Sequence, residues 1–189
     1  MRTTLLAILT LTVAISIHAK EITWHQGSIV LSDRKVVAGD LARVGFDLLI
    51  FRDENGQVTT YPAHKVSSFR YHDHAHDINR VFISVGVGNS RKFFERVVFG
   101  KFSVLRIQRS FSESFDETNP DSFDFFVAKE TVVCSIDKFR KKYYPLVKQE
   151  LDEQMIPHSN LDPNTRLGAV SLIILYNQST PPSSLASLN

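Results

Sequence analysis

The chain has 189 residues, of which 43% are hydrophobic, and its 22 basic and 20 acidic residues nearly balance. So small a net charge lacks the basic excess that is typical of nucleic-acid-binding proteins, and we expect no nucleic-acid partner. The single cysteine, Cys134, excludes an intrachain disulfide. A chain of this size buries about 70% of its unfolded surface on folding, so it can be stable without disulfide bonds.

The N-terminus reads as a secretory signal peptide over residues 1–19. Arg2 gives the N-terminal end a positive charge, and residues 5–17 form an apolar run interrupted only by Thr and Ser. Ala19 is a small residue at the expected cleavage site. The run is shorter than the roughly 20 residues of a membrane span. We therefore expect cleavage near Ala19, export to the periplasm or the cell exterior, and no transmembrane segment in the mature chain. The alternative is a buried N-terminal strand or helix.

Residues 24–71 predict about five short strands joined by tight connections. Apolar and polar residues alternate there, and turn residues separate the segments. Asn55-Gly56 predicts a type I′ hairpin, because both central residues of that turn need positive φ. Pro62 has no N–H for the ladder and predicts a strand end or an edge strand. Together these features indicate a meander or a small barrel.

Further strand segments follow, and they pair across short turns at Gly100-Lys101 and Lys129-Glu130. Between these pairs, the acidic and serine-rich stretch 110–122 predicts an extended, mobile hairpin loop. The order of segments in residues 55–69 resembles that in residues 123–139. One barrel and two repeated β units therefore remain alternatives.

The pattern changes near residue 136. Apolar residues recur at three- and four-residue steps, which is typical of an amphipathic helix. Proline is tolerated only in the first turn of a helix, so Pro145 predicts one short helix ending near Tyr143 and another beginning at Tyr144. Asp162-Pro163 predicts the start of a final helix.

The predicted fold class is α+β. We expect mostly antiparallel β structure, a small barrel or β-roll of about nine strands, followed by two or three C-terminal helices. The expected domain spans residues 20–178 and is helical from about residue 136. Residues 179–189, rich in Pro and Ser, predict a disordered tail.

One stretch carries the only dense group of potential metal ligands in the sequence. Alternate side chains of an extended chain share a face, so His72, His74 and His76 would project together if a strand continues through them. Imidazole suits Zn²⁺, and Asp73 and Asp77 could act as ligands or as acceptors for the ring N–H groups. The alternative is a polar, solvated connection between two strands.

The same stretch is similar to the His-x-His-x-Asp-His motif of metallo-β-lactamase-like hydrolases only in its first half. His76-Asp77 has the reverse order, and only His158 lies downstream. The chain is also far too short for that fold. We therefore reject this resemblance.

A basic run with interspersed aromatics begins the helical part. Lys138, Arg140, Lys141 and Lys142 could lie on an anionic membrane surface. The alternative is the solvated face of a helix whose apolar side packs on the sheet.

Motifs of established chemistry are missing from the sequence. It contains no Gly-x-Ser-x-Gly elbow, phosphate-binding glycine loop, His-Glu-x-x-His, EF-hand loop or cysteine metal spacing. Cys134 alternates within an apolar segment and predicts a small core residue, with a reactive thiol as the alternative. Asn177-Gln178-Ser179 fits a glycosylation sequon, which matters only in a eukaryotic secretory host.

Most of the mature chain resembles a recurring pattern in exported bacterial proteins of unknown function. The resemblance implies a β-rich exported protein with C-terminal helices, and it brings no activity, cofactor or catalytic residue. It rests on Trp24-x-x-Gly27-x-Ile29-x-Leu31-x-Asp33, Gly39, Asp47-x-Leu49, Asn55-Gly56, Tyr61-Pro62-Ala63-x-x-Val66-x-x-Phe69 and Asp137-Lys138-Phe139-Arg140-Lys141-Lys142.

Three functions stay open at this point. The leading hypothesis is a non-enzymatic exported protein that acts through surface contacts. The second is a metal-binding protein or metalloenzyme that uses the histidines and Asp77, with Zn²⁺ as the candidate ion. The third is a peripheral membrane-surface protein.

Overall fold

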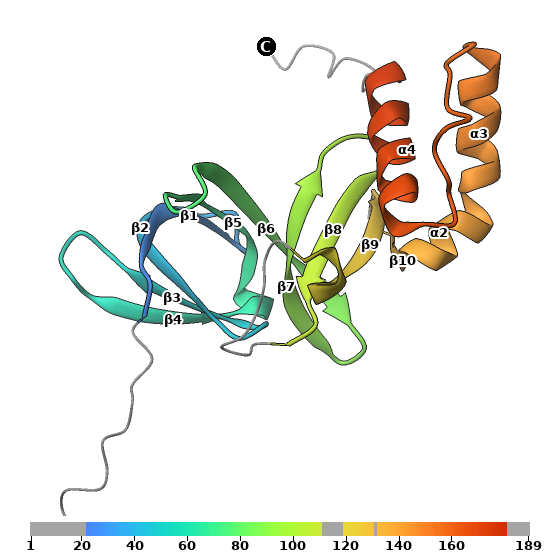
Figure 1. The fold of residues 1–189 in the computed structure, drawn as a ribbon. Coiled ribbons are helices and arrows are strands. Elements are labelled where there is room, and N and C mark those ends of the chain that lie inside the picture. Colours follow the sequence, from blue (N-terminus) through green and yellow to red (C-terminus); the bar gives the residue numbers. More distant parts are fainter. Residues whose placement is uncertain (1–21, 111–118, 131, 181–189) are drawn as a thin grey trace, which may run out of the picture.

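The computed structural model describes residues 22–110, 119–130 and 132–180. These residues form an α+β fold, in which one antiparallel ten-stranded sheet is followed by three C-terminal helices. The strand order is β10-β9-β8-β7-β6-β5-β1-β2-β3-β4 (Figure 1). The predicted fold class is confirmed, but the sheet is open rather than closed into a barrel.

Two meanders make up the sheet. They join because β1 pairs with both β2 and β5. The first four strands are β1 (His25–Leu31), β2 (Val36–Val44), β3 (Leu48–Arg52) and β4 (Val58–Pro62). After the short helix η1 (Ala63–Lys65), the second meander runs through β5 (Val66–Asp73), β6 (Ile78–Val87), β7 (Ser90–Val98), β8 (Ser103–Gln108), β9 (Phe123–Lys129) and β10 (Val132–Ser135), with η2 (Pro120–Ser122) before β9.

The strands β1–β5 curl into a roll (Figure 1). Gly27 on β1 and Gly39 on β2 lie directly opposite each other. A Cβ on Gly27 would come within 2.2 Å of the Arg70 carbonyl oxygen, and one on Gly39 within 2.5 Å of the Arg52 carbonyl oxygen. Only glycine allows strands to approach so closely. The inner face of the roll is an apolar core that includes Ile29 0%, Leu41 1%, Leu49 0%, Val66 1% and Phe69 2% exposed.

Besides its pairing through β5, the roll contacts β6 and β7 by isolated hydrogen bonds. The Phe93 N–H on β7 donates to the Phe46 carbonyl oxygen in the β2–β3 turn at 2.7 Å, and the Ser84 hydroxyl donates to the Ala63 carbonyl oxygen at 2.6 Å. The bond from Ala63 N–H to Asp47 O makes Leu48 and Pro62 a non-hydrogen-bonded pair, so the backbone of Pro62 faces away from β3. Proline has no N–H to offer there, which protects this edge from further pairing.

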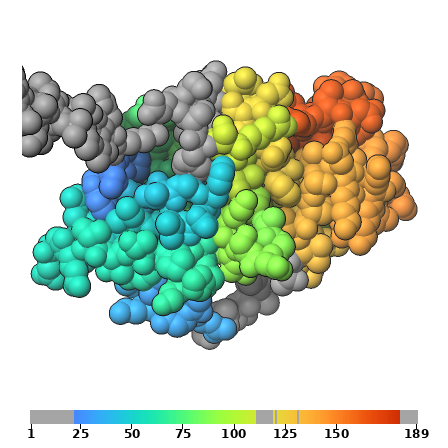
Figure 2. Space-filling model, turned by 90° about the horizontal axis from the view of Figure 1, so that it is seen from below, coloured from blue at the N-terminus to red at the C-terminus, as the bar shows by residue number. Residues whose placement is uncertain are grey.

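The three helices are α2 (Ile136–Lys142), α3 (Tyr144–Glu153) and α4 (Arg166–Ser179). They lie beside β8–β10, at the end of the molecule opposite to the roll (Figures 1 and 2). Val104, Val127 and Cys134 on these strands form one core with the buried side chains of the helices, which include Phe139, Val147, Leu151, Leu172, Ile173 and Tyr176.

The helix junctions follow local rules. Tyr143 ends α2 and precedes α3, and Pro145 occupies the first turn of α3, as predicted. The final helix begins later than Asp162 would suggest. Thr165 is its N-cap, and its hydroxyl accepts from the Gly168 N–H at 3.0 Å. The Asp162 carboxylate instead accepts from the Asn164 N–H, which forms a turn ahead of the helix.

The β3–β4 hairpin is confirmed, but its turn is longer than a type I′ turn. Gly56 has positive φ and Asn55 does not. The Asp53 carboxylate accepts from the N–H groups of Asn55 and Gln57, which stabilises the longer loop. The two stretches compared as repeats also differ, because β9 pairs with β10 whereas β4 pairs with β3 and β5 with β1.

The signal peptide and most of the proposed tail and acidic loop lie outside the described residues. Ser179, the first residue of the proposed tail, belongs to α4. None of the helices in the described ranges has both the length and the apolarity that crossing a bilayer requires.

Candidate functional site

The histidine stretch is a hairpin between β5 and β6. Strand β5 ends at Asp73, and β6 begins at Ile78. The Asp73 carboxylate accepts from the Ala75 N–H at 3.1 Å, and its carbonyl oxygen accepts from the His76 N–H at 3.3 Å. Asp77 closes the turn with a φ of 52°. The strand therefore does not continue through the three histidines.

The turn separates the imidazoles. The ring centroids of His72 and His74 lie 4.6 Å apart, and His72 contacts Asn79 and Asp77 at 3.2 and 3.3 Å. His76 contacts the Asp73 carboxylate instead, at 3.0 Å. Across the described part of the chain, no group of three or more His, Cys, Asp or Glu side chains is placed to hold a metal ion. Binding of Zn²⁺ by this stretch stays a prediction.

Asp73 turns inward and begins a row of three buried charges and one partly buried charge, which we call the charge ladder: Asp73, Arg80, Glu95 and Arg106. Arg80 Nε donates to Asp73 Oδ2 at 2.6 Å, and its Nη1 donates to Glu95 Oε1 at 3.1 Å. Arg106 Nε donates to Glu95 Oε2 at 2.8 Å. Successive members come from β5, β6, β7 and β8, so the ladder crosses four strands.

The ladder is on the same face of the sheet as both apolar cores. Val104 and Arg106 are two residues apart on β8, as Arg80 and Phe82 are on β6, and residues two apart in a strand share a face. Val104 belongs to the helix-covered core and Phe82 to the core of the roll. The charges therefore lie between two apolar cores.

Because these charged side chains are shielded from water, each depends on its partner in the ladder. Asp73 and Arg80 are each 6% exposed and Glu95 is 8% exposed. Burial by itself would raise the pKa of Asp73, but hydrogen bonds from Arg80 and His76 outweigh it and lower the pKa to about 2. Asp73 is therefore ionised at every physiological pH, and removing one member of the ladder would leave a buried charge unpaired.

Two further polar side chains, Arg43 and Gln108, lie beside the ladder. Arg43, from β2, donates through Nη2 to Gln108 Oε1 on β8 at 2.8 Å. Its guanidinium carbon lies 4.9 Å from the centroid of the Phe82 ring, and that of Arg106 lies 4.2 Å from the Phe123 ring. We call Arg43, Arg80 and Arg106 the arginine cluster.

The arginine cluster lines a small cavity. Its volume is about 20 Å³, enough for about one water molecule, and Tyr71, Phe82, Glu95, Gln108 and Phe123 complete the lining. Burial raises the pKa of Tyr71 to about 12, so its hydroxyl stays protonated. Guanidinium forks are typical of oxyanion recognition.

The ladder was not predicted, although the sequence carries a signal for it. On each of β6, β7 and β8, one charged residue lies two positions from a buried apolar residue and therefore points to the same face of the sheet. The pairs are Arg80 and Phe82, Phe93 and Glu95, and Val104 and Arg106. A charge at an inward position is expected to be paired. Which charges pair depends on strand order, and β5–β8 are adjacent only in the folded sheet.

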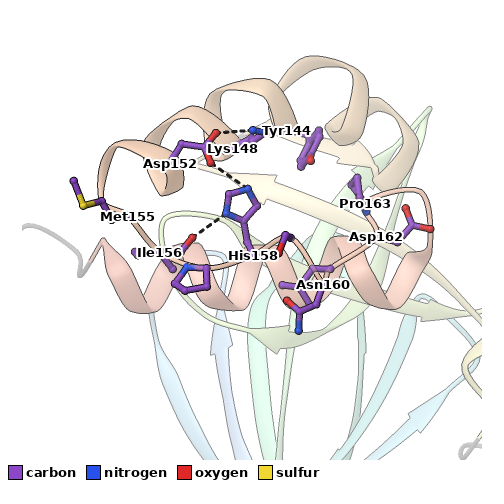
Figure 3. Close-up of a pocket in the computed structure, with 12 residues that line it drawn as sticks. Tyr144, Lys148, Asp152, Met155, Ile156, His158, Asn160, Asp162 and Pro163 are labelled. Carbon is purple, nitrogen blue, oxygen red and sulfur yellow. Dashed lines mark hydrogen bonds and ion pairs between the residues drawn. The ribbon is translucent and has the colours of Figure 1, made fainter.

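A larger open cleft of about 720 Å³ lies between α3 and the segment that leads to α4. His158 projects into it (Figure 3). Its Nδ1 lies 2.9 Å from the Ile156 carbonyl oxygen, and its Nε2 lies 3.5 Å from Asp152 Oδ1. A hydrogen bond from Lys148 lowers the pKa of Asp152. Of these contacts, the one between His158 and Asp152 links the segment to α3.

The basic run divides into two parts. Lys138, Lys141 and Lys142 are exposed on α2. Arg140 is half-buried, where its guanidinium donates to Asp137 and to the carbonyl oxygen of Asn164. Arg140 therefore holds the segment before α4, and three lysines remain as the exposed basic face.

Cys134 is buried at 8% exposure, as predicted, and burial raises the pKa of its thiol. A buried thiol with a raised pKa is a poor nucleophile.

Comparison of the chain with protein-family models, with curated proteins and with solved structures found no match.

Proposed function

We propose that this chain is an exported, non-enzymatic binding protein that recognises its ligand at the arginine cluster. The observation that carries the proposal is the small cavity that Arg43 from β2, Arg80 from β6 and Arg106 from β8 line together. Arginine side chains stacked on aromatic rings bind planar anionic groups, and they are poor general acids and bases because they stay protonated. Export rests on the N-terminal sequence and remains part of the proposal.

A ligand array tests the site. The purified protein is applied to immobilised peptides and glycans that carry carboxylate, sulfate, phosphate or amine groups. We expect retention of wild type, and of the control Arg70→Gln, on some anionic members. Arg70 is exposed on β5, on the face opposite to the ladder. The Arg43→Gln/Arg106→Gln variant should lose that retention.

Two outcomes would contradict the proposal. Retention that is indifferent to the double substitution would place binding elsewhere. A change in the mass of a recovered ligand, detected by mass spectrometry, would contradict a non-enzymatic function.

Export has its own test. We expect the chain, produced with its own N-terminus in a bacterial host, to be recovered outside the cytoplasm with Lys20 as its first residue. N-terminal sequencing that finds Met1 on the recovered protein would contradict cleavage near Ala19.

A membrane-surface function is a second candidate, supported by Lys138, Lys141 and Lys142, which are exposed on α2, and by Leu146 on α3, which is 56% exposed. Exposed lysines near apolar side chains favour anionic lipid surfaces. Sedimentation with anionic vesicles should fall when the three lysines are changed to Gln, and a Lys35→Gln/Lys65→Gln control should bind as wild type. Equal sedimentation with neutral vesicles would contradict this candidate.

Zinc binding is supported only by the adjacent rings of His72 and His74. Calorimetric titration of the untagged protein with Zn²⁺ should give a signal that His72→Ala/His74→Ala abolishes and His64→Ala preserves. Equal signals from all three proteins would contradict the histidine site.

A further inference from the structure

We propose that two copies of this chain pair through β4, edge to edge and antiparallel, about a two-fold axis at Thr60. Strand β4 is the last strand of the sheet, and its outer side has no neighbouring strand among the described residues (Figure 1). This pairing goes beyond the proposed binding function and involves no member of the arginine cluster, whose residues belong to β2, β6 and β8.

The outer side of β4 carries unpaired backbone groups. The backbone of Pro62 faces away from β3, and those of Thr60 and Val58 do so as well, because the hydrogen-bonding direction alternates along an antiparallel strand. In the part of the chain that the structure describes, no hydrogen bond reaches the N–H or C=O groups of Thr60 and Val58. These groups form a ready template for another strand.

Little on β4 opposes such pairing. Its sequence Val-Thr-Thr-Tyr-Pro contains no charged residue, and charged side chains are a common protection of natural sheet edges. Pro62 protects only one end of this edge, because it lacks an N–H but keeps its carbonyl oxygen. The opposite edge strand, β10, is shorter, with four residues against five, and leads directly into α2. Strand β4 is therefore the more open edge.

The register of the pair follows from the free groups. If Thr60 faces the partner's Thr60, the two residues exchange both N–H···O bonds, and Val58 faces the partner's Pro62. Each Val58 N–H then donates to the carbonyl oxygen of Pro62 in the other copy, so that the proline is used as an acceptor. Every other antiparallel register pairs fewer residues of β4.

The charges at the two ends of β4 are opposite, and they identify a second copy as the occupant of the edge. Glu54 lies in the turn before β4, and Lys65 lies at the end of η1 after it. Both are exposed, and neither has an ion-pair partner among the described residues. In an antiparallel pair, the turn of one copy lies beside η1 of the other, so opposite charges meet at both ends of the pair.

Cysteine cross-linking tests the register. The native Cys134 is buried, so a new cysteine on β4 would be the reactive thiol. In the proposed pair, the Cα atoms of the two copies of residue 60 lie about 5.5 Å apart, within disulfide range, and those of residue 58 about 14 Å apart. We expect Thr60→Cys to give a disulfide-linked dimer on mild oxidation and the matched control Val58→Cys to stay monomeric.

Sedimentation velocity tests the pairing without a cross-link. We expect a reversible dimer whose fraction rises between about 1 µM and 1 mM, because a single short edge makes a small interface. Thr60→Lys places two positive charges opposite each other and should abolish the dimer, while its circular dichroism spectrum should match that of wild type. The control Asn89→Lys adds the same charge at an exposed turn and should dimerise as wild type does.

Charge exchange tests the two ends of the pair. Glu54→Lys and Lys65→Glu should each weaken the dimer about two- to fivefold, and the double variant should recover the wild-type affinity. A monomer at every concentration, a dimer that survives Thr60→Lys, or equal cross-linking of Thr60→Cys and Val58→Cys would overturn the inference. Failure of the double variant to recover affinity would overturn it as well.

Discussion

Met155 occupies the C′ position of a Schellman motif at the end of α3. The Ile156 N–H donates to Leu151 O at 2.9 Å and the Met155 N–H to Asp152 O at 3.0 Å, while Met155 itself has a φ of 55°. Glycine is the usual residue there, because a Cβ is strained at positive φ. The side chain is 90% exposed, so it contributes little packing.

Met155→Gly should therefore raise the free energy of unfolding by about 1 kcal/mol. Urea denaturation measures the change. Met155→Ala is the control, since it removes the side chain but keeps the Cβ, and it should bring no gain. A loss of stability in Met155→Gly would show that the exposed side chain has a structural role.

Asp73 predicts a pH dependence of stability. Its pKa of about 2 lies below the ordinary 3.8, so its ionised form stabilises the fold at all pH values above about 4. This contribution, about 2 kcal/mol, is lost as the pH falls from about 4 through 2. Asp73→Asn should be less stable than wild type at pH 6 and should show a flatter decline between pH 4 and 2.

The control for this prediction is Asp77→Asn. Its side chain is 95% exposed and lies in the same turn, so its stability curve should follow that of wild type. The free energy of unfolding of wild type and both variants is measured by urea denaturation at several pH values. A decline as steep in Asp73→Asn as in wild type would contradict the assignment.

At the scale of elements, Asn177 fastens α4 to the turn between β7 and β8. Its amide nitrogen donates to Phe99 O at 3.2 Å and Phe102 O at 2.8 Å, and its amide oxygen accepts from Phe102 N–H at 3.1 Å. A Cβ on Gly100 would lie 2.3 Å from the Asn177 side chain, so this turn needs glycine. The amide of the possible sequon is thus already engaged.

Asn177→Ala should lower the free energy of unfolding by about 1–3 kcal/mol, because the backbone groups of the turn lose their partners. Hydrogen exchange should also show faster opening of α4. Gln178→Ala, at the exposed neighbour, is the control and should change little. Equal effects of the two substitutions would mean that the contact does not secure the helix.

Other elements could be predicted because their causes are local. The break between α2 and α3 follows from the missing N–H of Pro145, and the hairpins follow from turn residues between alternating segments. The start of α4 was misplaced because Asp162 and Thr165 are both good capping residues. In the structure Thr165 caps α4, and the Asp162 carboxylate closes the turn before it.

At the scale of the whole molecule, the charge ladder lies between the core of the roll and the core under the helices. Arg80→Met would leave Asp73 and Glu95 facing each other without their shared cation. We expect a loss of about 3–5 kcal/mol in the free energy of unfolding, measured by urea denaturation.

The control for Arg80→Met is Arg109→Met, which breaks an ion pair with Asp124 whose side chains are 45% and 50% exposed. It should cost less than about 1 kcal/mol. Adding Asp73→Asn and Glu95→Gln to Arg80→Met should recover part of the loss. Similar costs for Arg80→Met and Arg109→Met would show that the ladder contributes no more than a surface pair.

The sequence by itself determined the α+β class, the alternation of the strands, the helix break and the burial of Cys134, because each depends on a few neighbouring residues. The tertiary structure alone decided that β1 pairs with β5, that the sheet stays open, and that four charges from β5, β6, β7 and β8 meet between the two apolar cores. Periodicity tells which side chains share a face of one strand, whereas strand order and register tell which strands are neighbours. The histidines were conspicuous for their spacing, yet it was Asp73, between them, that the fold turned inward to start the ladder.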